Sequence, residues 1–92
     1  MPAGGSTSDA RAHRLDVRFH SVETAVRDGR RVKESRVEWR RSGALIGVCR
    51  WHPDTGWSLV DGASIGVPGH YESLWQLRDR ILDMVRIHRM RI

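Results

Sequence analysis

Residues 25–39, AVRDGRRVKESRVEW, combine a chain-reversal signal with a charged, alternating segment. The Asp28-Gly29 pair is typical of a two-residue hairpin turn, because glycine adopts a positive φ without steric cost. Beyond the turn, apolar and charged residues alternate as they do in a half-buried strand. The stretch therefore predicts a β-hairpin whose returning strand covers about residues 32–41. The two predicted faces of that strand carry Val37 and Trp39 on one side, and Arg36, Glu38 and Arg40 on the other.

The segment before the turn also alternates with a period of two, from Leu15 onward. The apolar members are Leu15, Val17 and Phe19, and the polar members are Asp16, Arg18 and His20. In an antiparallel pair, the apolar sets of both strands share one face of the sheet. One face is therefore expected to be apolar, and the other to hold the charged row.

Two further strands are predicted downstream. The apolar run 44–51, ALIGVCRW, indicates a third strand, and WHPDTGW at 51–57 contains the turn residues Pro53, Asp54 and Gly56. A fourth strand is expected over residues 57–61. If His52 pairs with Trp57, then Trp51 and Trp57 lie on opposite faces of the sheet.

The C-terminal part of the chain predicts a long amphipathic helix. Ser73 and Gln76 have the spacing of a capping box, in which each side chain bonds the backbone of the other residue. Apolar residues then recur at intervals of three and four up to Ile92. Arg78 falls inside this apolar stripe, so we expect it to extend toward solvent or to pair with an acid on the sheet.

These elements predict an α+β fold, with a four-stranded antiparallel meander sheet and one long C-terminal amphipathic helix packed on one face. Residues 14–92 form a single β-β-β-β-α domain in this prediction, and residues 1–13, MPAGGSTSDARAH, form a disordered tail. The chain is 39% hydrophobic and contains four Trp residues, as is typical of a folded protein. A chain of this size has a thin core.

The net charge of +5 is concentrated in the N-terminal half. Residues 11–41 contain ten basic side chains and five acidic ones, and the whole chain contains fifteen Arg against one Lys. Arg binds phosphates and base edges with two parallel hydrogen bonds, which Lys does not. The same preference is also expected from a genome rich in G and C, so composition leaves both explanations open.

The first functional hypothesis is a small basic module that binds nucleic acid, most simply DNA, through an Arg-rich sheet face. It requires Arg18 and Arg40 to lie on the same uncovered face, and it predicts binding that weakens with salt. A solvated face with cross-strand ion pairs is the alternative reading of the same row. The nucleic-acid-binding residues in this hypothesis are Arg18, Arg30, Arg31, Lys33, Arg36, Arg40 and Arg41.

The second hypothesis is a protein-interaction, adaptor or inhibitor domain, whose candidate partners include a second copy of the chain in a homodimer. The third predicted strand is apolar on both sides, and a single helix covers only one of them. The interface would use Ile46, Val48, Trp51 and Trp57. Alternatively, the loop 62–69, with Ile65 and Val67, folds over the second side.

The third hypothesis is a small basic ribonuclease. His20 and Glu38 supply an acid and a base, and the arginines around them would bind the phosphate. Chance co-occurrence of such residues is the simpler explanation, so we expect a binding protein without catalytic residues.

No cofactor, metal, membrane or small-molecule substrate is predicted. Cys49 and His52 are spaced like two metal ligands, but a structural zinc site needs four, and a strand places the two on opposite faces. A single cysteine cannot form an internal disulfide, and no signal peptide or apolar run of membrane-spanning length is visible. These features favour a cytoplasmic protein.

Overall fold

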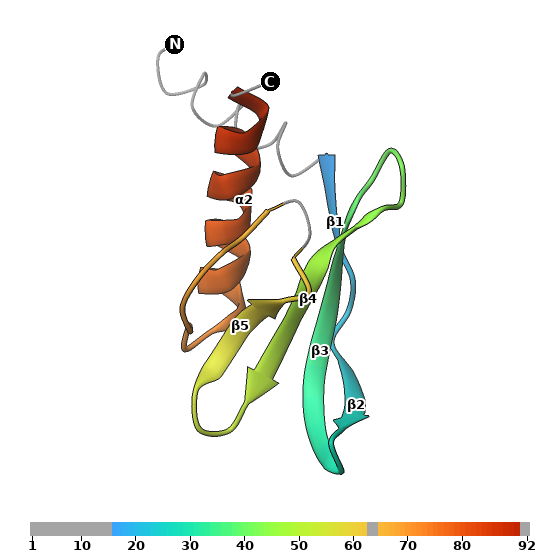
Figure 1. Cartoon of the computed structure of the whole chain (residues 1–92), viewed down its shortest axis with the longest axis vertical. Helices are drawn as coiled ribbons and strands as arrows, with labels where there is room; N and C mark the ends of the chain where they lie inside the picture. The colour runs from blue at the N-terminus through green and yellow to red at the C-terminus, as the bar shows by residue number, and fades with distance from the viewer. Residues whose placement is uncertain (1–15, 63–64, 91–92) are drawn as a thin grey trace.

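A computed structural model describes residues 16–62 and 65–90, and shows an α+β fold (Figure 1). One helix packs against one face of a curled antiparallel sheet, as the sequence predicts. The predicted tail, residues 1–13, lies outside the described residues. The elements are β1 Val17–Phe19, β2 Glu23–Arg27, β3 Arg30–Trp39, β4 Leu45–His52, β5 Gly56–Val60 and α2 Leu74–Met90.

The first predicted strand is divided into two, β1 and β2, and both pair with the long strand β3. Figure 1 shows them one above the other along β3. The division begins at His20, whose N–H still donates to Arg36 O at 2.9 Å. The carbonyl of His20 instead accepts from Ser35 Oγ at 2.6 Å and from Arg78 Nη2 at 3.1 Å. The ladder therefore stops there, because side chains take the place of the next strand hydrogen bond.

The reversal at Asp28-Gly29 is confirmed. Arg27 pairs directly with Arg30, which leaves a two-residue turn between β2 and β3. The φ angles of Asp28 and Gly29 are 53° and 75°. Two successive positive φ values match the I′ turn, whose twist suits a hairpin.

A β-bulge changes which residues of β4 face the helix. Val37 pairs with Gly47, whereas Glu38 pairs with Leu45, so Ile46 is an extra residue in the strand. Ile46 is fully buried, and Leu45 is exposed. Alternation would place Ile46 on the same side of the strand as Val48, and this expectation is wrong, because simple alternation does not continue through a bulge.

The register of the β4–β5 hairpin also differs from the prediction. His52 pairs with Gly56, so Trp51 lies directly opposite Trp57 on the same face. The predicted opposite placement is wrong because the turn contains three residues, 53–55, and Gly56 already belongs to β5. Along the other edge of β5, Trp57 and Tyr71 form an isolated bridge.

Helix α2 begins with the predicted capping box. Gln76 N donates to Ser73 Oγ at 3.2 Å, and Ser73 N donates to Gln76 Oε1 at 3.3 Å. The core-facing stripe is led by Leu77, Ile81 and Val85, which are fully buried. No helix within residues 16–62 and 65–90 is long and apolar enough to cross a membrane.

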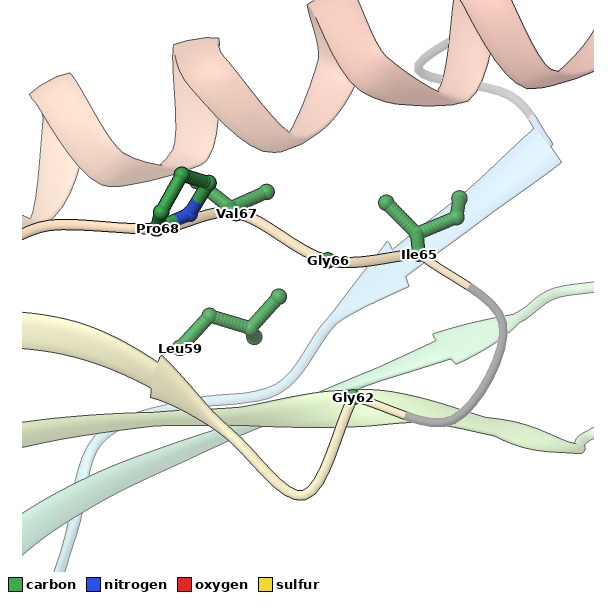
Figure 2. Close-up of a pocket in the computed structure, with 6 residues that line it drawn as sticks. All are labelled: Leu59, Gly62, Ile65, Gly66, Val67 and Pro68. Carbon is green, nitrogen blue, oxygen red and sulfur yellow. The ribbon is translucent and has the colours of Figure 1, made fainter.

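The loop after β5 completes the core on the helix side of the sheet. Ile65 and Val67 are buried with the residues of α2, and Figure 2 shows this segment running between the helix and the strands. An apolar hollow of about 350 Å³ lies between the segment and Leu59. The loop therefore does not cover the opposite side of the sheet, which we call the outer face.

Candidate nucleic-acid interface

The outer face is defined by the strand registers and by the two-residue period of each strand. It carries five arginines and three glutamates, together with two histidines. Most of these side chains form two clusters, each centred on one glutamate of β3. The charged and imidazole residues of this face are Arg18, His20, Glu23, Arg27, Arg30, Glu34, Arg36, Glu38, Arg50 and His52.

The first cluster surrounds Glu38. His20 Nε2 lies 2.9 Å from Glu38 Oε1, while Arg18 Nη1 and Arg36 Nη2 lie 3.9 Å and 3.7 Å from its two oxygens. The hydrogen bond from His20 lowers the pKa of Glu38, and the two arginines lower it further despite the opposing effect of desolvation. The Arg18 and Arg36 side chains remain 57% and 61% exposed. Their guanidinium groups are therefore available to a ligand.

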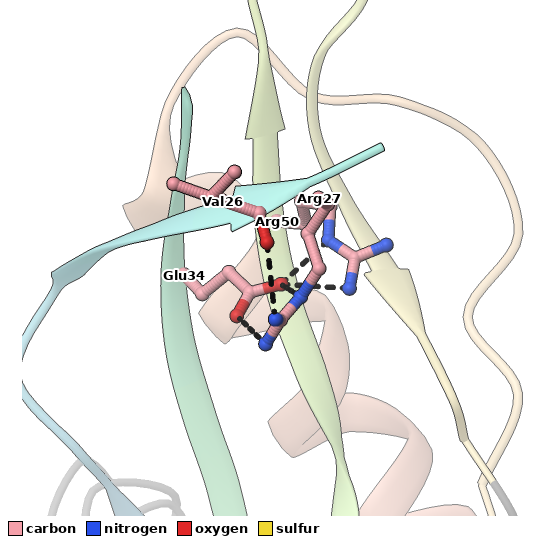
Figure 3. Close-up of polar contacts among 4 residues, drawn as sticks. All are labelled: Val26, Arg27, Glu34 and Arg50. Carbon is pink, nitrogen blue, oxygen red and sulfur yellow. Dashed lines mark hydrogen bonds and ion pairs between the residues drawn. The ribbon is translucent and has the colours of Figure 1, made fainter. Parts of the chain in front are cut away.

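The second cluster surrounds Glu34 and joins three strands (Figure 3). Arg27 contacts both carboxylate oxygens, with Nε 3.2 Å from Oε2 and Nη2 2.8 Å from Oε1. Arg50 places Nε and Nη2 each 2.7 Å from Oε2. Desolvation raises the pKa of Glu34, but hydrogen bonds and charge from the two arginines outweigh it, so the net pKa is lowered.

Sequence reasoning did not identify the Glu34 cluster. Glu34 lies in the polar segment KES, which is the weakest part of the predicted strand. The available signal was its spacing of two residues from Arg36 and four from Glu38, which places all three on one face. The contributions of Arg27 and Arg50 depend on the registers of β2 and β4 against β3, and no local pattern encodes those.

Each cluster leaves positive charge in excess. Glu34 is shared by two arginines, and Glu38 lies between two arginines and His20. The predicted cross-strand ion pairs are therefore present, and they orient the guanidinium groups without neutralising them all. The pairs of Glu38 with the exposed Arg18 and Arg36 contribute little to stability, about 0–1 kcal/mol each, whereas Glu34 is itself buried.

Three of the predicted nucleic-acid-binding residues, Arg18, Arg30 and Arg36, lie on the outer face. Arg31 and Lys33 lie on the opposite face near the end of the β2–β3 hairpin, because they occupy odd positions of β3. Lys33 Nζ lies 5.3 Å from the centre of the Trp51 ring, a cation–π contact.

Arg40 does not share the outer face, so the requirement that it lie with Arg18 fails. Strand β3 ends at Trp39, and residues 40–42 form a turn in which Arg40 N donates to Asp16 O. Alternation stops with the strand, and Arg41 belongs to the same exposed turn. Arg40 instead borders a hollow of about 260 Å³ beside the helix, whose other lining residues are Val17, Phe19, Trp75, Arg78, Asp79 and Leu82.

The four residues of the predicted apolar interface do not share one exposed face. Ile46 and Trp57 belong to the core, and Trp51 is half-buried on the helix side. Val48 alone of the four predicted residues lies on the outer face. The bulge and the β4–β5 register are the physical reasons, since each moves a large side chain inward.

His20 and Glu38, the acid and base of the ribonuclease hypothesis, lie in direct contact. An acid and a base for this reaction act on different oxygens of one phosphate, so they need a space between them. Here the two side chains contact each other at 2.9 Å on an open face. The structure therefore brings together the two residues of the ribonuclease hypothesis, and each side chain has the other as its contact.

Cys49 and His52 lie on opposite faces of β4, as the strand period predicts. Cys49 is fully buried, and desolvation raises its pKa to about 12 although the charge of Arg78 opposes this. The thiol therefore stays protonated at neutral pH and serves as a core side chain. Within the described ranges, no three His, Cys, Asp or Glu residues are grouped as metal ligands.

No family model, curated protein or solved structure matches this chain. Its chemistry is therefore inferred from the side chains of the outer face itself.

Proposed function

We propose that this protein binds nucleic acid through the outer face of its sheet. The observation that carries the proposal is five arginines against three glutamates on one sheet face that neither the helix nor the loop 65–73 covers. Positive charge on a protein surface attracts the phosphate backbone and accelerates encounter with it. Arg40 lies beside the helix and not with Arg18, as the sequence-based hypothesis required, so the proposal excludes Arg40 and rests instead on the five arginines that the strand registers place on this face.

The ion pairs favour binding because they restrict the arginines before a ligand arrives. A guanidinium group held by a carboxylate loses less rotamer freedom when it binds a phosphate. Arg18 and Arg36 lie at ion-pair distances of 3.9 Å and 3.7 Å from Glu38, and both are more than half exposed. Their remaining N–H groups are able to donate to phosphate oxygens.

The test is the salt dependence of binding to a fluorescent DNA or RNA probe. The affinity is expected to fall steeply as salt increases, and Arg36→Ala is expected to weaken it and reduce the salt slope by about one counterion. Arg40→Ala and Arg80→Ala are matched controls that remove the same charge elsewhere. Arg80 lies on α2, where it pairs with Asp83 at 3.8 Å.

Binding that is insensitive to salt, or equal effects of Arg36→Ala and Arg80→Ala, would contradict this assignment. Circular dichroism of each variant verifies that the fold is retained. Arg40→Ala distinguishes two placements of Arg40. Beside the helix, where the structure has it, its loss should leave the affinity unchanged. Simple alternation along the strand would place it on the outer face and predict the same loss of affinity as Arg36→Ala.

A protein partner, including a second copy of the chain, is the second candidate. Trp75 favours it, because this side chain is 70% exposed and borders the hollow beside Arg40. Large exposed aromatic residues are frequent anchors of protein interfaces. The test is sedimentation analysis, in which a dimer that dissociates in Trp75→Ser would support this alternative.

We place the proposed activity in the cytoplasm. The support is the single cysteine, Cys49, which is buried and has no second cysteine in the chain with which to form a disulfide.

A further inference from the structure

We infer that the outer face binds the major groove of double-stranded DNA rather than single strands or an RNA duplex. This inference rests on the proposed function and specifies its ligand. It is carried by three observations: the residues that the face lacks, the side of β3 from which each arginine comes, and the width of the sheet.

The outer face of the described strands carries no Phe, Trp or Tyr. Single-stranded nucleic acids are bound largely by stacking of bases on aromatic rings. Here the strand aromatics point to the helix side, and Trp39 even contacts His88 of α2, with ring centres 6.0 Å apart. The aromatic residues are Phe19, Trp39, Trp51 and Trp57 on the strands, Tyr71 beside β5, and Trp75 on the helix. The described part of the outer face therefore lacks the large aromatic platforms of single-strand binders, and its flat side chains are the smaller imidazoles of His20 and His52 and the arginine guanidinium groups.

Three of the five outer-face arginines flank the central strand, and the other two, Arg30 and Arg36, lie on β3 itself. Arg18 of β1 and Arg27 of β2 reach toward β3 from one side, and Arg50 of β4 reaches toward it from the other. The two carboxylates lie between them on β3 itself, at Glu34 and Glu38. A groove presents the complementary arrangement, with a row of negatively charged phosphates along each wall and base edges between the rows.

The strands that carry the arginines span less than the width of the major groove of B-form DNA, and β5 continues the sheet beyond β4. Neighbouring strands lie about 4.8 Å apart, so β3 and the strands on either side span roughly 10 Å between their outer axes. The major groove of B-DNA is about 12 Å wide and admits β-strands, as in the β-ribbon class of DNA readers. The major groove of A-form RNA is deep and narrow, and side chains do not read it.

The experiment compares three probes of one sequence, namely duplex DNA, duplex RNA and single-stranded DNA, by fluorescence anisotropy at the same salt concentration. The duplex DNA is expected to bind at least about tenfold more tightly than either of the others. Equal or tighter binding of the RNA duplex or of the single strand would overturn this inference and leave the proposed function standing. If none of the three binds in a salt-dependent manner, both fail.

Two further measurements assign the binding to this face and to this groove. Arg18→Gln removes an exposed charge from one side of β3, and it is expected to weaken duplex binding and to lower the salt slope by about one. Arg80→Gln is the matched control on the helix. Netropsin, which fills the minor groove, is expected to leave the affinity unchanged, and displacement of the protein by netropsin would rule out the major groove.

Discussion

Arg78 of α2 donates from Nη2 to Ser35 Oγ of β3, over a distance of 3.0 Å. The guanidinium carbon also lies 5.0 Å from the Phe19 ring and 5.6 Å from the Trp75 ring. The expected acidic partner of Arg78 is thus replaced by two neutral oxygens, Ser35 Oγ and His20 O. This polar contact attaches the helix to the sheet at the position where β1 ends.

Ser35→Ala is expected to destabilise the fold by about 1–3 kcal/mol, because Ser35 is fully buried and its hydroxyl joins Arg78 to His20 O. Urea denaturation gives the change in the free energy of unfolding. Ser58→Ala, on the outer face of β5, is the control and is expected to change it by less than about 0.5 kcal/mol. Equal effects of the two substitutions would show that the contact contributes nothing.

Glu34→Gln is expected to flatten the dependence of stability on acid pH. The pKa of Glu34 in the folded protein is below its ordinary value of 4.5, so the ionised form favours folding. This stability is fully present above pH 4.5 and is lost as the pH falls through the lower, folded pKa. The unfolding free energy of the wild type should therefore decrease more between neutral pH and about pH 3 than that of the variant. If exposed Glu72→Gln reproduces the flattening, the assignment to Glu34 is wrong.

Gly56→Ala is expected to be more damaging than Gly29→Ala, although both glycines have positive φ angles, 84° and 75°. A Cβ at Gly56 would lie 2.5 Å from the backbone oxygen of Tyr71, whereas a Cβ at Gly29 meets nothing within 4 Å. Gly29→Ala should cost about 1–2 kcal/mol from the left-handed backbone alone. Gly56→Ala should cost about 1–3 kcal/mol more, because the clash adds to that strain. Thermal denaturation of both variants checks the order.

The purified protein is expected to leave RNA intact, because His20 and Glu38 contact each other instead of flanking a phosphate. Incubation with a labelled RNA and gel electrophoresis measures cleavage. Cleavage that disappears in Glu38→Gln but persists in Glu72→Gln would refute this prediction and restore the ribonuclease interpretation.

The parts of the fold that depend on residues close together in the sequence were predicted correctly. The Asp28-Gly29 turn depends on the backbone freedom of two adjacent residues, and the capping box depends on Ser73 and Gln76 alone. Both are present, and the helix and the antiparallel sheet follow from apolar periodicity in the same way. Such features need no information about distant parts of the chain.

Features that depend on contacts distant in sequence were not predictable. Ile46 faces inward because of a bulge, and the break at His20 depends on Arg78, which is 58 residues away in the sequence. The candidate interface shows the same division. Arg18 and Arg36 follow from alternation, whereas the place of Arg27 and Arg50 at Glu34 required the strand registers.

The break at His20 also affects how the sheet meets other chains. A long unpaired edge is a template on which another molecule can add a strand and begin to aggregate. Here the edge beyond β3 is divided into β1, with three residues, and β2, with five, while Tyr71 bridges to the opposite edge strand at Trp57. Within the described part of the chain, the His20 carbonyl that interrupts the ladder thus keeps the edge strands short and limits aggregation by strand addition.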